Sequence, residues 1–230
     1  MSEKEYVLYL RDELLRARDE NIFLADEKLL MQMINIKFII TYDNSQFYNL
    51  GTTYAITKKN QSKTDLKYLL SLLNSKLIEF YYLKKFTNES SLTNAISTQN
   101  LFKIPIKNIP IESQQPFIIK ADQMLSLNKE LQEVNEKFQR TLQREFSIEK
   151  LSKKLENWHK LPFSDFLNEL KKQKVELSLS QKADWEDFLT EQQKAIAIQT
   201  KIQETDAKID KMVYELYGLT EEEIAIVENA

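Results

Sequence analysis

Residues 95–124 of the chain have the sequence AISTQNLFKIPIKNIPIESQQPFIIKADQM, and this stretch separates two kinds of predicted structure. In its first half, Pro105 and Pro110 disfavour helical conformation in the residues before them, which predicts an extended strand over residues 101–106. Pro116 occupies a position that the first turn of a helix tolerates, and Phe117 begins an apolar series of about eight turns. We therefore expect a compact, partly β body to end here and a long helix to begin.

Two segments beyond this point carry apolar side chains at seven-residue steps, which predicts helices over residues 116–146 and 180–218. Their heptad positions are Phe117, Met124, Leu131 and Phe138 in the first segment, and Phe188, Ala195, Ile202, Ile209 and Leu216 in the second. Two such helices bury their apolar faces by packing antiparallel. The sequence therefore predicts a coiled-coil hairpin with a helical cap over residues 147–179, followed by a short final helix capped by Thr220.

The first half of the chain predicts a small mixed α/β globular body. A helix is expected over residues 3–20, and strands over residues 37–41 and 52–57, where β-branched and aromatic residues are frequent. Thr64 is expected to cap a helix that continues to the lysines at 84–85. The predicted fold is α+β, with a globular domain at residues 1–115 and a helical domain at residues 116–230.

Composition limits the classes of function. Two glycines in 230 residues argue against glycine-rich phosphate loops, and the absence of cysteine excludes disulfides and thiolate zinc sites. No stretch of about 18 consecutive apolar residues occurs, so no membrane partner is expected. We expect a soluble, cytoplasmic protein.

Few residues support catalytic chemistry. His159 is the single histidine, and we interpret it as a surface or cap-packing residue and not as a metal ligand. Asp165 with Glu169 and Lys171 comes nearest to a nuclease motif, but these residues are expected on the solvent face of one helix. The aromatic run at residues 80–82 could stack a base, although helix-core packing is the commoner role. We expect no catalytic residue, no metal and no cofactor.

The charge distribution singles out the middle of the chain. The net charge is −3, yet residues 37–107 contain ten lysines against four acidic residues, whereas residues 116–230 contain 17 basic and 22 acidic residues. A basic block of this kind could face phosphates. On charge alone, a solvated lysine-rich surface is the simpler interpretation.

Several stretches, in this order, resemble a target-recognition domain. They are residues 28–56 (KLLMQMINIKFIITYDNSQFYNLGTTYAI), 65–82 (DLKYLLSLLNSKLIEFYY), 96–111 (ISTQNLFKIPIKNIPI) with 114–125 (QQPFIIKADQML), and 208–228 (KIDKMVYELYGLTEEEIAIVE). The resemblance is to the specificity subunits of type I restriction systems and to the TaqI-like C-terminal specificity domain of adenine-N6 methyltransferases and type IIG enzymes. The segments LNS at 73–75 and TQNL at 98–101 are its most recognisable parts.

The resemblance implies a module that binds double-stranded DNA and positions a methyltransferase domain or subunit, with a restriction subunit as a further candidate partner. The family's catalytic Asn-Pro-Pro-Tyr motif and glycine-bearing cofactor motif are absent from this sequence. The chain alone is therefore not expected to methylate DNA. It would serve either as a separate specificity subunit or as the C-terminal piece of a larger enzyme.

Two loops contain the residue types that such a module needs. Lysines contact phosphates, and Asn and Gln can make bidentate contacts to adenine. The predicted DNA-binding residues are Lys58, Lys59, Asn60, Gln61 and Lys63 in one loop, and Lys84, Lys85, Asn88, Asn94, Gln99 and Lys103 around the other.

An alternative function belongs to another class. The chain could be a non-catalytic coiled-coil adaptor, because an acidic hairpin surface would repel DNA and suit a protein partner. An enzyme in its own right is the third interpretation.

Overall fold

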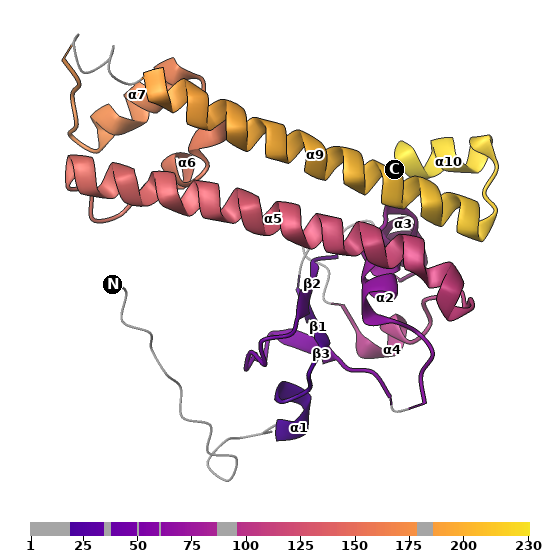
Figure 1. Ribbon diagram of the computed structural model, residues 1–230. Helices are drawn as coiled ribbons and strands as arrows, with labels where there is room; N and C mark the ends of the chain where they lie inside the picture. The colour runs from indigo at the N-terminus through magenta and orange to yellow at the C-terminus, as the bar shows by residue number, and fades with distance from the viewer. Residues whose placement is uncertain (1–18, 35–37, 50, 60, 87–95, 179–185) are drawn as a thin grey trace. The chain divides into compact units, whose positions relative to one another are not determined.

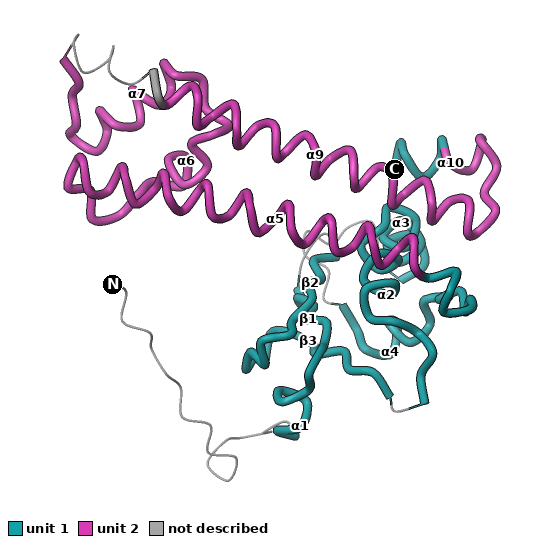
Figure 2. The backbone as a smooth tube through the Cα atoms, in the orientation of Figure 1, with its two compact units in different colours: residues 1–114, 225–230 teal, residues 115–224 magenta. Residues whose placement is uncertain are grey.

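The computed structural model describes residues 19–34, 38–49, 51–59, 61–86, 96–178 and 186–230. It divides into two compact units, which are described separately below. Unit 1 comprises residues 1–114 and 225–230, and unit 2 comprises residues 115–224 (Figure 2). A small antiparallel sheet together with long helices gives an α+β fold, which confirms the predicted class (Figure 1).

Unit 1 contains a three-stranded sheet in the order β2-β1-β3, formed by β1 (Lys28–Gln32), β2 (Ile40–Asp43) and β3 (Thr53–Ile56). Both neighbours of the central β1 are antiparallel to it, so that Met31 lies opposite Ile40 on one side and Tyr54 on the other. The strand predicted at residues 52–57 is confirmed as β3. The strand predicted at 37–41 lies a few residues later, as β2, and the central strand β1 was not predicted.

Four helices of unit 1 are described: α1 (Glu20–Phe23), α2 (Leu66–Leu73), α3 (Lys76–Phe86) and α4 (Thr98–Leu101). Most of the helix predicted at residues 3–20 lies outside the described residues. The prediction that Thr64 caps a helix is wrong, because the side chain of Asp65 accepts the Lys67 N–H at 2.7 Å and so caps α2. The single helix predicted up to residue 85 is two helices, separated at Asn74, whose side chain donates to the Ile40 carbonyl.

The strand predicted over residues 101–106 is also wrong. Residues 98–101 form α4, and the Phe102 N–H donates back to the Thr98 carbonyl at 3.1 Å, closing a helical turn. Ser97 has extended backbone geometry before this turn, as a residue preceding a helix does. Leu101 and Phe102, which were expected in a strand, therefore lie at the end of a helical turn.

A buried ion pair joins the ends of β1 and β2. Lys28 Nζ lies 2.6 Å from Asp43 Oδ2 and also donates to the Phe23 carbonyl at 2.8 Å. Burial alone would raise the pKa of Asp43, but the bond from Lys28 and the backbone N–H groups of Ser45 and Phe47 outweigh it and hold the pKa below its usual value. Each charge of the pair is thus hydrogen-bonded as well as neutralised, which is what burial of a charge requires.

Unit 2 is helical. Its long helices are α5 (Ile111–Phe146), which begins within unit 1, and α9 (Glu186–Tyr217), and they run in opposite directions (Figure 1). Between them in sequence lie α6 (Lys153–Glu156), the 3-10 turn η2 (Trp158–Lys160) and α7 (Phe163–Lys172), and α10 (Glu221–Glu228) follows α9. The helix α5 begins five residues before the predicted start at Pro116.

Among the described residues, no helix combines the length and the apolar character that crossing a membrane requires.

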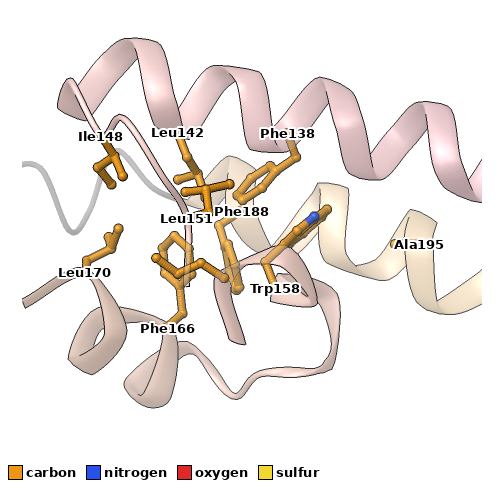
Figure 3. Close-up of a cluster of buried hydrophobic side chains, with 10 residues drawn as sticks. Phe138, Leu142, Ile148, Leu151, Trp158, Phe166, Leu170, Phe188 and Ala195 are labelled. Carbon is orange, nitrogen blue, oxygen red and sulfur yellow. The ribbon is translucent and has the colours of Figure 1, made fainter. Parts of the chain in front are cut away.

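An aromatic cluster joins the long helices to the segment between them (Figure 3). Phe138 of α5 stacks on the fully buried Trp158 of η2 with ring centroids 3.7 Å apart, and Phe166 of α7 stacks on Phe188 of α9 at 4.4 Å. The predicted heptad positions in both helices are buried or half-buried. The main backbone contacts of α9 are nevertheless with η2, so a coiled coil along the length of the two helices is not confirmed.

Candidate nucleic-acid interface

The loop between β3 and α2 presents the first group of predicted residues to solvent. Lys58, Lys59, Gln61 and Lys63 are all exposed, whereas Asn60 lies outside the described residues. The Ser62 N–H donates to the Lys59 carbonyl at 2.9 Å, which folds the loop into a turn. The lysines therefore extend from a short, hydrogen-bonded loop.

Gln114, in the first turns of α5, holds the end of this loop in place. Its side chain is fully buried, and its Oε1 accepts the Asp65 N–H at 2.8 Å. Its Nε2 donates to the carbonyls of Lys63 and Ile109, each at 3.0 Å. One amide side chain thus joins the β3–α2 loop to the segment that follows α4. Sequence reasoning missed this residue, since nothing in the local sequence distinguishes Gln114 from Gln115.

The chain entering α4 is fixed by three hydrogen bonds to the sheet and to α3. The Ile96 N–H donates to the Met33 carbonyl at 2.8 Å, and the Tyr54 hydroxyl donates to the Ile96 carbonyl at 2.9 Å. The Ser97 N–H donates to the Tyr82 hydroxyl at 3.3 Å. Tyr82 is buried, so this member of the aromatic run at 80–82 has the core role that was expected to be the commoner one.

The second group of predicted residues surrounds α3 and α4. Lys84 and Lys85 are exposed in the last turn of α3, and Gln99 and Lys103 are exposed in and just after α4. The Lys103 ammonium lies 5.8 Å from the ring centroid of Phe86, the last residue of α3, which brings these two segments together. The remaining predicted residues of this group, Asn88 and Asn94, lie outside the described residues.

An apolar hollow of about 420 Å³ opens beside β3, and we call it the β3–α4 hollow. It is lined by Tyr54, Ala55, Ile56, Thr57, Leu69, Leu73, Thr98, Leu101, Phe102, Ile104 and Ile106. Phe102 is 89% exposed, although it lines the hollow. Sequence reasoning did not select Phe102, because residues 101–106 were interpreted as a strand.

The segments that border this hollow are basic. Residues 57–64 and 96–109 contain no aspartate or glutamate. Lys58 and Lys59 directly follow Thr57 of the lining, and Lys103 lies between the lining residues Phe102 and Ile104. An apolar hollow bordered in this way would attract a polyanion that also carries apolar groups.

His159 and Glu169, two titratable residues of unit 2, are both buried. His159 is buried, as a cap-packing residue would be, and burial, with a smaller effect from Lys160, lowers its pKa. Glu169 was expected on a solvent face, and that expectation is wrong because it is buried and accepts from Lys172 at 2.7 Å and Ser152 at 3.2 Å. The Lys172 bond, which outweighs burial, lowers the pKa of Glu169. The described part of the chain contains no cluster of three or more His, Cys, Asp or Glu side chains suited to a metal ion.

Comparison with known proteins finds two family models that match different parts of the chain. The family model of the TaqI-like C-terminal specificity domain matches residues 1–106, which confirms the resemblance over this part of the chain. Such a match indicates DNA sequence recognition in restriction–modification, and a specificity domain is non-catalytic in itself. A second family model, described as a domain of unknown function, matches residues 110–213. No curated protein and no solved structure matches the chain.

Proposed function

We propose that this chain, whose residues 1–106 match the TaqI-like C-terminal specificity domain, recognises a specific sequence in duplex DNA for a restriction–modification system. That match is the observation that carries the proposal. Adenine-N6 methylation and DNA cleavage would be performed by another domain or chain, which this module positions on its target.

The exposed lysines of unit 1 would hold the DNA backbone, and the amide side chains would contact base edges. Lys58, Lys59 and Lys63 are exposed on a loop whose end is bound to Gln114 through the Lys63 carbonyl. The full set of proposed DNA contacts comprises Lys58, Lys59, Asn60, Gln61, Lys63, Lys84, Lys85, Asn88, Asn94, Gln99 and Lys103.

The helical part would serve as the spacer between this reader and its catalytic partner. We propose the functional division at residue 115, with residues 1–115 binding DNA and residues 116–230 contacting the methyltransferase. In this proposal α5 and α9 act as an antiparallel hairpin whose heptad positions pair in a coiled coil. The aromatic cluster formed with Trp158 supports this, because it joins the two helices to the segment between them.

Selection of bound sequences from a random duplex pool, followed by a gel shift on the selected duplex, tests the proposal. If about four to six phosphates are contacted, the plot of log affinity against log salt should have a slope of about −4 to −5. Replacing Lys58, Lys59 and Lys63 together by Gln should lower affinity and reduce that slope by about one for each lysine removed.

The matched control replaces three exposed lysines of unit 2, Lys129, Lys137 and Lys201, by Gln. This variant has the same change in net charge, but its three lysines lie outside the proposed DNA-binding unit. It should therefore leave duplex affinity and the salt slope unchanged. Equal losses in both triple variants would mean that the effect follows net charge and not the β3–α2 loop. No enrichment of any sequence from the pool would contradict sequence recognition itself.

The excess of acidic residues in the second half of the chain favours a second candidate, a non-catalytic adaptor that binds proteins. A pull-down with a candidate methyltransferase subunit, with and without duplex DNA, separates the two. Capture of the methyltransferase with no affinity for any duplex would favour the adaptor.

A further inference from the structure

We infer that the β3–α4 hollow binds one unstacked nucleobase and that Phe102 is the ring against which this base stacks. The inference rests on the proposed DNA binding, because it specifies how the same surface would contact its target. It adds a base-contacting residue that the sequence analysis did not select.

The position of Phe102 supports a role in binding. A phenylalanine ring that is 89% exposed is hydrated in the free protein, so its contact with a planar apolar group is favourable. The ring belongs to a segment that Met33, Tyr54 and Tyr82 fix through Ile96 and Ser97, so little backbone ordering is needed on binding. Stacking of a base on an exposed aromatic ring is a common way to bind nucleic acid without a deep pocket.

The edge of β3 supplies hydrogen-bonding groups to the wall of the hollow. The Met33 N–H donates to the Thr52 carbonyl, and hydrogen-bonded positions alternate along an antiparallel pair. Tyr54 and Ile56 therefore bond to β1, while the N–H and C=O of Ala55 face away from the sheet. β3 is an edge strand in the described sheet, and Ala55 lines the hollow, so these groups are available to the edge of a base.

The charges beside the hollow favour a nucleotide over an apolar peptide. The bordering residues 57–64 and 96–109 carry lysines and no acidic side chain. A base that leaves the stack brings its own phosphate and the next one close to the pocket that receives it, so Lys58, Lys59 and Lys103 would have anionic partners. An apolar peptide would give these lysines no such partner.

Binding to the selected duplex and to versions with one mismatch at each position tests the inference. A mismatched base costs less to unstack, so the wild-type protein should bind one such duplex more tightly than the matched one. Phe102→Ala should weaken binding to the matched duplex by about 10-fold or more and remove the preference for the mismatch. Phe102→Trp should keep both, because it retains a stacking ring.

Phe47→Ala is the matched control, since Phe47 is a phenylalanine of unit 1 that is 65% exposed but does not line the hollow. It should leave matched and mismatched affinities unchanged. Full affinity of Phe102→Ala for the selected duplex would overturn the stacking role while leaving the proposed function intact. Absence of duplex binding by the wild-type protein would instead overturn the proposed function. Loss of methyltransferase binding alone by Phe102→Ala would identify the hollow as a protein-docking site and refute the base assignment.

Discussion

Replacing Gln114 provides a sharp test of how the β3–α2 loop is held. In Gln114→Ala, the Asp65 N–H loses its acceptor, and the carbonyls of Lys63 and Ile109 lose their donor. Gln114→Glu retains an acceptor for Asp65 but places a carboxylate against two carbonyl oxygens. The two variants therefore affect the same loop through different bonds.

The expected magnitude follows from these three bonds. Each buried group left without a partner costs about 1–3 kcal/mol, and values near the lower end apply because the loop borders solvent. We expect Gln114→Ala to lose about 3 kcal/mol of local stability, which corresponds to roughly 100-fold faster hydrogen exchange at the Asp65 amide. In Gln114→Glu the Asp65 amide should keep its protection, whereas affinity for DNA should fall as in the alanine variant because Lys63 is no longer held.

Gln115→Ala is the control, since Gln115 is the exposed neighbour on the same helix. Its exchange rates and DNA affinity should match those of the wild-type protein. Unchanged protection of the Asp65 amide in Gln114→Ala would refute the reasoning, because it would mean that the buried amide side chain does not hold the loop.

Three further predictions concern the two cores and pH. Phe166→Ala should lower the unfolding free energy of unit 2 by about 3–5 kcal/mol, seen as a lower urea midpoint in tryptophan fluorescence. Because burial depresses the pKa of His159 below its usual 6.5, the unfolded state binds the extra proton first, so the midpoint should fall as pH drops from 7 towards 5.5. His159→Phe should flatten that dependence, and a pH dependence equal to that of the wild-type protein would contradict this assignment. Asp43→Asn should cost unit 1 about 3–5 kcal/mol by leaving a buried ammonium, measured by hydrogen exchange of the β1 amides, and Lys28→Met in the same chain should recover most of it.

Features set by neighbouring residues could be predicted from the sequence. The final helix begins with the expected cap, in which Thr220 Oγ1 accepts the Glu223 N–H and the Glu223 carboxylate accepts the Thr220 N–H. The heptad spacing correctly predicted two long helices, because the apolar side chains of each helix recur at seven-residue steps within one continuous segment. Pro116 misled the start of α5: the helix begins at Ile111, although a proline inside a helix removes one hydrogen bond and its ring clashes with the carbonyl four residues earlier.

The site depended on contacts between distant residues, which local patterns do not encode. Gln114 bonds to groups about 50 positions earlier in the chain, so no sequence spacing could have identified it. Pro105 and Pro110 predicted a strand over residues 101–106, but α4 extends to Leu101, and the hydrogen bonds of Ile96 and Ser97 to the sheet and α3 fix the chain that enters this helix. The exposure of Phe102 follows from that turn, so it could not be foreseen while a strand was expected.

The order of the two units along the chain has a mechanical consequence. Unit 2 is an insertion, because residues 225–230 belong to unit 1, where Glu228 forms an ion pair with Lys76. Two covalent connections, one on each side of the insertion, therefore join unit 2 to unit 1.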